Sequence, residues 1–186
     1  MTMTGLFDRI RTTRVRAVKR LAVIAAGVTI GTFQLCGIAG VRINASPSLP
    51  IGVYLTSSQP EANLVEFCPS EPFATFAIAR GYRDAGVCPD AAAPLMKPIV
   101  AGPGDVVEVS GQGIAVNGYL LPNTAPLAID SHGRSLTPWP FGRYVVAPDT
   151  LWVASSHHPR SFDSRYFGPI PAGSIRDRLR PLLIAW

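Results

Sequence analysis

An uncharged apolar stretch of 21 residues, 21–41, constrains this chain more than any other feature. As a helix it reaches roughly 30 Å, the thickness of the hydrocarbon core of a bilayer. Residues 1–20 carry six basic side chains against one acidic side chain. Because basic flanks stay in the cytoplasm, we expect a cytoplasmic segment at 1–20, a transmembrane anchor at 21–41 and an exported domain at 43–186.

Two other interpretations of the apolar stretch stay open. A cleaved signal peptide also begins with a basic region, although its apolar core is usually only ~7–15 residues long and no clear cleavage site follows here. A buried helix of a soluble protein is the second alternative. The anchor remains our prediction, and it makes the lipid bilayer a partner of the chain.

The net charge of +5 does not indicate a nucleic-acid partner, because the excess lies at one end of the chain. Residues 1–20 have a local charge of +5, whereas residues 43–186 carry ten basic and eleven acidic side chains. A groove that follows a polyanion needs positive charge along its surface. We therefore expect no nucleic acid among the partners of the exported domain.

Turn residues are dense, with 18 prolines and 17 glycines, so long helices are not expected. Short apolar runs between turns predict a mainly β domain, either a barrel or a sandwich. The Asn117-Gly118 pair predicts a hairpin. The predicted strands are a short one within 43–56, then 96–100 with an interruption at Pro98, 106–109, 114–116, 119–121, and 144–146 paired with 151–155.

The remaining segments are less regular. Residues 57–95 are expected to be irregular apart from a short helix at 73–83. Residues 122–140 are predicted to be a proline-rich loop that acts as a lid, an insertion or a docking surface. Residues 174–186 are predicted to be a strand or a short helix, since Pro181 argues against a long one.

Two of the three cysteines, Cys68 and Cys88, lie in the predicted exported domain. Thiols pair in oxidising compartments, so we expect a disulfide between them, with two free buried thiols as the alternative. Closing a loop of this length is worth about 3 kcal/mol by the chain-entropy estimate.

Common catalytic motifs are missing: the sequence has no GxSxG, HExxH, P-loop or GxGxxG. His132, His157 and His158 are the only histidines, and no third ligand stands at a helpful spacing for a metal. We therefore predict no metal and no cofactor.

Three segments carry the strongest functional signal: residues 44–54 (NASPSLPIGVY), 95–105 (LMKPIVAGPGD) and 161–169 (SFDSRYFGP). In this order, after an N-terminal anchor, they resemble the signal peptidase I family of Ser/Lys endopeptidases. The SLPIGVY and FDSRYFGP runs are most similar to its conjugative-transfer branch, the TraF-type pilin-processing peptidases. The resemblance implies a signal-peptidase-like β domain in the periplasm, held by a single-pass anchor in a bacterial inner membrane.

The resemblance implies that Ser48 is the nucleophile and Lys97 its general base. A serine hydroxyl is a weak nucleophile until a base removes its proton. Lysine accepts that proton only when neutral, so its pKa must fall from about 10.4 towards neutrality. Apolar neighbours such as Met96 and Ile99 favour the neutral form. A lysine that extends to solvent from a strand is the other interpretation.

Further roles are implied by the same resemblance. The Ser46 hydroxyl and the backbone N–H of Ser48 form the oxyanion hole. Asp163 and Arg165 form a supporting ion pair, and Ser161 is a further supporting residue near the lysine. The other interpretations are an ordinary turn serine for Ser46 and a surface salt bridge for Asp163 and Arg165.

The chain also departs from the general secretory enzymes. Those enzymes carry a Gly-Asp-Asn run where this chain has Ser155-Ser156-His157, and an arginine where this chain has Pro98 after Lys97. Both departures argue against a housekeeping enzyme.

The resulting hypothesis is a membrane-anchored serine endopeptidase that processes exported precursors, with a membrane-bound pilin subunit as substrate and type IV secretion components as partners. An acyl-enzyme reacts with water or with an amine, so hydrolysis and cyclisation of the pilin are both open. A housekeeping signal peptidase I is the second hypothesis. A non-catalytic anchored scaffold of a secretion apparatus is the third.

Overall fold

The structure is a computed structural model that describes residue 19, residues 21–24 and residues 40–185. The chain divides into two units, Met1–Val41 and Arg42–Trp186. Among the described residues, no helix is both long and apolar enough to cross a bilayer. Most of the predicted anchor lies outside those residues, so the anchor stays a prediction.

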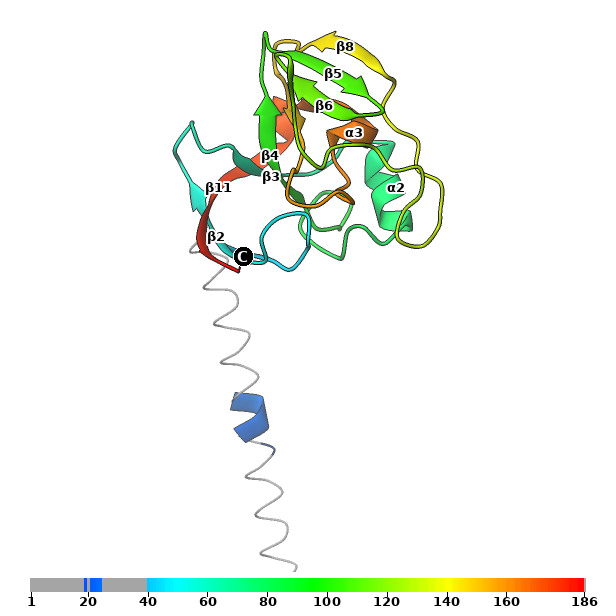
Figure 1. Ribbon diagram of the computed structural model, residues 1–186. Helices are drawn as coiled ribbons and strands as arrows, with labels where there is room; N and C mark the ends of the chain where they lie inside the picture. The colour runs from blue at the N-terminus through cyan, green and yellow to red at the C-terminus, as the bar shows by residue number, and fades with distance from the viewer. Residues whose placement is uncertain (1–18, 20, 25–39, 186) are drawn as a thin grey trace, which may run out of the picture. The chain divides into compact units, whose positions relative to one another are not determined.

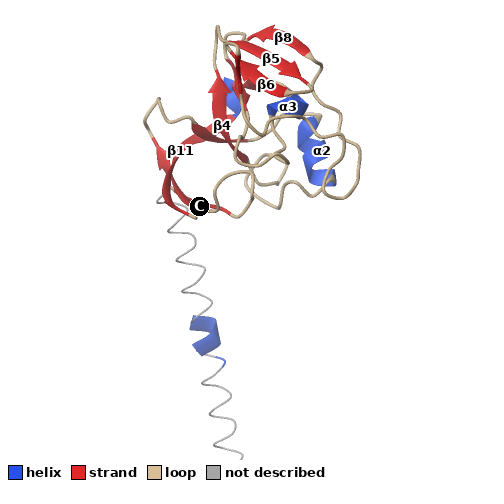
Figure 2. Cartoon of the chain, viewed as in Figure 1, coloured by secondary structure: helices blue, strands red, loops and turns tan. Residues whose placement is uncertain are grey.

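The second unit is mainly β, as predicted (Figure 2). Its described strands are β1 (Val41–Asn44), β2 (Gly52–Ser57), β3 (Leu64–Phe67), β4 (Leu95–Ala101), β5 (Val106–Ser110), β6 (Gly113–Val116), β7 (Tyr119–Leu120), β8 (Gly142–Val145), β9 (Thr150–Val153), β10 (Ile170–Pro171) and β11 (Ile175–Ile184). The helical elements are α2 (Phe73–Ala79), α3 (Ser164–Phe167) and the 3-10 turn η1 (Ala172–Ser174).

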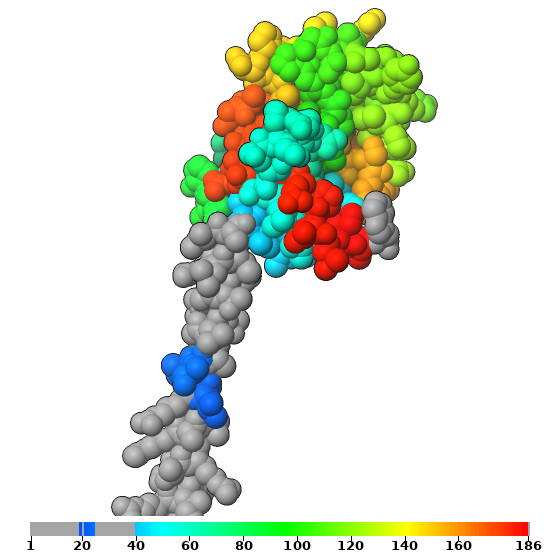
Figure 3. Space-filling view, turned by 90° about the vertical axis from the view of Figure 1, so that its left-hand side faces the viewer, coloured from blue at the N-terminus to red at the C-terminus, as the bar shows by residue number. Residues whose placement is uncertain are grey.

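The strands form two sheets (Figure 1). One has the order β1-β2-β11-β3-β4-β9-β10, and the other has the order β7-β6-β5-β8. Strand β11 lies between β2 and β3 and pairs antiparallel with both. In the space-filling view, the red residues of β11 lie at the surface near cyan residues of the segment around β2 (Figure 3).

Strand β2 approaches β11 closely at Gly52. This residue has a φ of +154°, and a Cβ added to it would lie 2.2 Å from the carbonyl oxygen of Leu183. A larger residue therefore clashes with the main chain of β11, so the glycine in the SLPIG run is required for this pairing.

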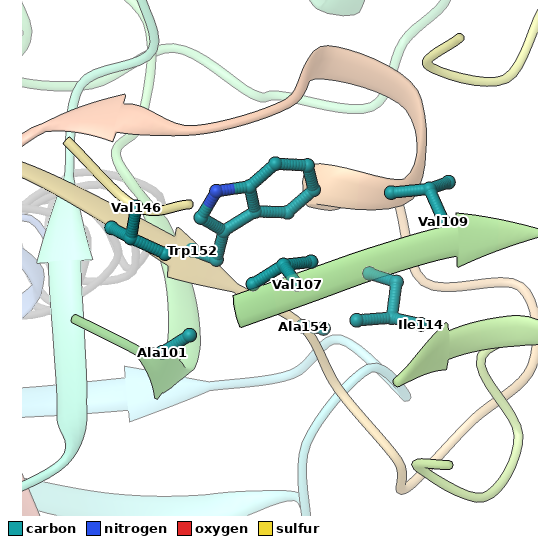
Figure 4. Packing of buried hydrophobic residues seen from close by; sticks show 7 residues of the cluster. All are labelled: Ala101, Val107, Val109, Ile114, Val146, Trp152 and Ala154. Carbon is teal, nitrogen blue, oxygen red and sulfur yellow. The ribbon is translucent and has the colours of Figure 1, made fainter. Parts of the chain in front are cut away.

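The largest core cluster lies where β9 meets the four-stranded sheet. Trp152 of β9 is 1% exposed and packs among small and branched residues of the facing strands (Figure 4). The cluster consists of Ala101, Val107, Val109, Ile114, Val146, Trp152 and Ala154. A smaller cluster joins Leu49 of the loop between β1 and β2 to Tyr54, Leu64 and Leu179 of the strands.

The hairpin at Asn117-Gly118 is confirmed, with positive φ values of 50° and 85°. The predicted pairing of 144–146 with 151–155 is wrong, since β8 pairs with β5, whereas β9 pairs with β4 and β10. Trp152 and Val153 are both buried, so β9 needs cover on both faces and takes an inner position in the larger sheet.

Three other segments differ from the prediction. Strand β3 lies in a segment that was predicted to be irregular. All four of its residues are buried, so its sequence lacks the alternation of polar and apolar residues that indicates a strand. The helix predicted at 73–83 ends at Ala79. Strand β4 continues through Pro98, whose carbonyl oxygen accepts a hydrogen bond from Ala154 N at 3.1 Å, and the pairing with β9 shifts register between Ile99 and Ala101. The C-terminal segment is a strand, one of the two structures predicted for it, and its register shifts beyond Pro181.

Candidate active site

The loop between β1 and β2 is folded around the side chain of Asn44, which is 6% exposed. Its amide nitrogen lies within hydrogen-bond distance of the carbonyl oxygens of Ser46, Leu49 and Pro50. Its Oδ1 accepts a hydrogen bond from Ser46 N at 3.1 Å. Asn44 therefore satisfies the loop's main chain from inside, where water has little access.

This loop brings the side chain of Ser48 into contact with Lys97 of β4. Lys97 lies in β4 opposite Val65 of β3, and its Nζ donates a hydrogen bond to Ser48 Oγ at 2.7 Å. The two residues are 8% and 4% exposed, respectively. The lysine therefore does not extend to solvent, which removes that alternative interpretation.

Burial lowers the pKa of Lys97 from 10.5 to about 8. The Asp163 carboxylate raises this pKa and the Arg165 guanidinium lowers it, but both effects are smaller than that of burial. Because these two charges oppose each other, the loss of hydration decides the protonation state. A substantial fraction of the amine is therefore neutral at mildly alkaline pH, within hydrogen-bond distance of the Ser48 hydroxyl.

Ser46 also contacts Ser48. The two hydroxyl oxygens lie 2.8 Å apart, and Ser48 N donates to Ser46 Oγ at 3.2 Å. The two donors predicted for an oxyanion hole are thus neighbours that are bonded to each other in this arrangement. An anionic oxygen that enters between them can take both hydrogen bonds in exchange for the one they share.

Asp163 and Arg165 form a fully buried ion pair, with both side chains 0% exposed and Arg165 Nε 2.8 Å from Asp163 Oδ1. The guanidinium donates five hydrogen bonds. Two reach the carboxylate, and three reach the main-chain carbonyls of Asn123, Ser155 and Pro159. Every donor is used, which is what makes a buried charge pair tolerable.

Ser155 connects this ion pair to the loop that carries Ser48. Its N–H donates to Asp163 Oδ2 at 3.0 Å, and its hydroxyl donates to the carbonyl oxygen of Ser48. Sequence reasoning did not single out either Ser155 or Asn44. The signal for Ser155 was its place in the run that departs from the secretory enzymes, and Asn44 offered none beyond its position in the first segment.

Ser161, His157 and His158 lie near the site without a direct contact to Lys97 among the hydrogen bonds of the described residues. Ser161 is 2% exposed, and its hydroxyl has no hydrogen-bond partner in the described part of the chain. Its supporting role stays a prediction. His158 lines the same cavity as Ser161, while His157 N donates to Ser155 Oγ. No group of three or more potential metal ligands occurs among the described residues.

A cavity of about 600 Å³ opens beside Ser48 and Lys97. Such a volume suits a short stretch of peptide. One wall comes from the proline-rich loop at 122–140, which we call the strap. The residues of the strap that line the cavity are Leu127, Ile129, Asp130, Ser131 and Leu136.

The strap is fastened by Asp130. Its carboxylate accepts hydrogen bonds from Tyr82 Oη at 2.7 Å and Arg134 Nε at 2.7 Å, and Arg80 Nη1 lies 3.4 Å away. Burial opposes the ionisation of Asp130, but these hydrogen bonds outweigh it and hold the pKa well below its ordinary value. The strap is thus joined to the turn after α2.

The predicted disulfide between Cys68 and Cys88 is present. It links the segment after β3 to the loop that precedes β4. The same loop contains a buried Arg83, whose guanidinium donates to Asp90 and to the carbonyl oxygen of Ala93. The disulfide and this ion pair together fix the approach to the strand that carries Lys97.

Comparison with known proteins gives the family of this chain. The family model described as signal peptidase, peptidase S26 matches residues 12–183. The chain therefore belongs to the signal peptidase S26 family, whose members are peptidases of the serine kind.

Among its relatives is a plasmid transfer protein TraF of Escherichia coli, 38% identical over 178 residues that cover 92% of this chain and 99% of the relative. A conjugal transfer protein TraF of Agrobacterium fabrum is 37% identical over 172 residues, covering 90% and 96%. A crystal structure of a signal peptidase I from Enterococcus faecalis aligns with a TM-score of 0.36 at 18% identity, covering 67% of this chain and 99% of that one.

Proposed function

We propose that this chain is a membrane-anchored serine endopeptidase that processes exported precursors, with a conjugative pilin subunit as its substrate. The observation that carries the proposal is the 2.7 Å contact between Lys97 Nζ and Ser48 Oγ in a nearly water-free position. The likeness to TraF proteins supports the choice of substrate and a type IV secretion apparatus as partner.

In the proposed reaction, neutral Lys97 takes the proton of Ser48 Oγ as this oxygen attacks the scissile carbonyl carbon. Ser46 and the N–H of Ser48 stabilise the oxyanion. Protonated Lys97 then gives its proton to the leaving amine as the C–N bond breaks, which leaves an acyl-enzyme.

The acyl-enzyme is resolved by water or by an amine. Lys97 removes a proton from the acceptor, the ester bond to Ser48 Oγ breaks, and the proton returns to the serine. Water yields a hydrolysed product. The amino terminus of the same pilin yields a ring that is lighter by one water.

The test uses full-length protein in membranes with the pilin precursor of the same transfer system. We expect Ser48→Ala and Lys97→Met to abolish processing, while Ser110→Ala, a serine substitution in the four-stranded sheet, leaves it intact. Mass spectrometry of the pilin reports the cleavage site and identifies a ring.

Other outcomes separate the alternatives. Normal processing by Ser48→Ala would indicate a non-catalytic scaffold. Cleavage of secretory signal peptides in preference to the pilin would indicate a housekeeping signal peptidase I.

A further inference from the structure

Ser155 is a fully buried residue whose polar atoms are all engaged. Its N–H donates to Asp163 Oδ2 at 3.0 Å, and its carbonyl oxygen accepts from Arg165 Nη2 at 2.9 Å. Its hydroxyl oxygen accepts from His157 N at 3.1 Å and donates its own hydrogen to the carbonyl oxygen of Ser48. The side chain therefore spans the distance between the buried ion pair and the main chain of Ser48.

Within the loop, Ser48 is the residue whose backbone torsions need such a hydrogen bond. Pro47 and Pro50 have restricted φ angles, and each also restricts the residue before it. The two backbone torsions of Ser48 are not restricted by either proline. The bond from Ser48 N to Ser46 Oγ holds the N-terminal side of the residue, and the bond from Ser155 holds its carbonyl.

Ser155 does not belong to the cavity wall, whose described residues include Ser48, Lys97 and Ser161. Its hydroxyl contacts the main chain of Ser48 and does not line the cavity. A displacement of about 1 Å in a reacting group can cost roughly 100-fold in rate, so a bond that fixes the carbonyl of Ser48 has a direct effect on its attacking oxygen.

We propose that Ser155 is a positioning residue, which locks the main chain of Ser48 to the Asp163–Arg165 ion pair and thereby sets the direction of Ser48 Oγ. This inference rests on the proposed function, since it needs Ser48 to be the nucleophile. In this proposal the Asp163–Arg165 ion pair positions Ser48 through Ser155, in addition to the opposed effects of its two charges on the pKa of Lys97.

The test compares Ser155→Ala with the wild-type full chain in detergent micelles, using hydrolysis of p-nitrophenyl acetate. We expect kcat to fall by roughly 10- to 100-fold while KM changes less than about 2-fold. The midpoint of the pH–rate profile should not move, because Asp163 and Arg165 are retained. Hydrogen exchange of residues 44–50 should become faster.

Two further variants serve as controls. Ser155→Thr keeps the hydroxyl and should recover most of the lost kcat. Ser164→Ala removes another fully buried hydroxyl, which accepts from Val153 N, and should lower stability without changing kcat. If Ser155→Ala does not fold, the nearly isosteric Ser155→Cys takes its place, since a thiol is a weak donor.

The outcomes separate this inference from the proposed function. If Ser48→Ala also hydrolyses the ester at the wild-type rate, the proposed function fails, and the inference fails with it. If Ser48→Ala is inactive but folded Ser155→Ala or Ser155→Cys retains wild-type kcat, only the positioning role is overturned. Equal losses in Ser164→Ala and Ser155→Ala would likewise overturn it.

Discussion

At the scale of single residues, the burial of Lys97 makes the fold less stable than it would be with an apolar side chain in that place. The native pKa of about 8 lies below the ordinary value of 10.5, so the unfolded chain binds the proton more tightly. Below pH 8 this difference costs the folded state about 3 kcal/mol. The cost shrinks as pH rises from 8 to 10.5 and is absent above that range.

We therefore predict that Lys97→Met is more stable than the wild type at pH 7 by about 3 kcal/mol, and that the gain disappears near pH 10.5. Urea unfolding of both proteins at several pH values measures the difference. A wild type as stable as the variant at pH 7 would show that the amine is not desolvated.

Under the proposed function, the same pKa predicts how activity depends on pH. Only neutral Lys97 accepts a proton, so the rate should rise with pH, reach half its maximum near pH 8 and then level off. A pH–rate profile of kcat/KM for ester hydrolysis measures the midpoint of the free enzyme. An optimum below pH 6 would exclude Lys97 as the base.

At the scale of elements, the strap depends on one carboxylate. Asp130→Asn keeps the size of the side chain but removes the charge that pairs with Arg134 and Arg80. We predict that trypsin cleaves the strap of this variant faster at Arg134 and that KM for the pilin precursor rises, because one wall of the cavity is loosened.

Asp149→Asn is the matched control, since Asp149 is exposed and lies in the turn before β9, outside the cavity wall. Timed proteolysis followed by mass spectrometry, together with precursor kinetics, distinguishes the two variants. Equal behaviour would show that the ion pairs of Asp130 do not hold the strap.

Elements with local signals were predictable and those fixed by distant partners were not. Asn117-Gly118 encodes its own hairpin because both residues tolerate positive φ. Strand β3 lacks alternation, and Glu66 within it argues against burial until Arg42 is placed beside it at 2.8 Å. The turn at 147–150 suggested a hairpin, but only the packing around Trp152 determines which sheet each flanking strand joins.

The candidate site divides in the same way. Ser48, Lys97, Asp163 and Arg165 were predicted from three segments with recognisable patterns, and the structure brings them together. Asn44 and Ser155 were not singled out, although Ser155 lies in the run that departs from the secretory enzymes, because residue type does not indicate which main-chain carbonyls a side chain will contact. The distance between Ser48 and Lys97, 49 residues apart, also required the tertiary structure.

At the scale of the whole molecule, the disulfide closes a segment of 20 residues that contains α2 and part of the cavity wall. We predict that Cys68→Ala combined with Cys88→Ala lowers the free energy of unfolding by about 3 kcal/mol. Urea unfolding measures this loss, with reduced wild-type protein as the control. If the reductant destabilises the double variant as well, the loss of stability in reduced wild-type protein does not arise from the Cys68–Cys88 bond.

The position of strand β11 between β2 and β3 determines when the candidate site can assemble. This strand separates β2, which follows Ser48, from β3, which pairs with the strand of Lys97, and it is the last strand in the described chain. While a nascent chain still lacks β11, the hydroxyl and the amine belong to two halves that no main-chain pairing joins. We therefore expect the contact between Ser48 and Lys97 to form only after β11 has been synthesised and has paired with both neighbouring strands.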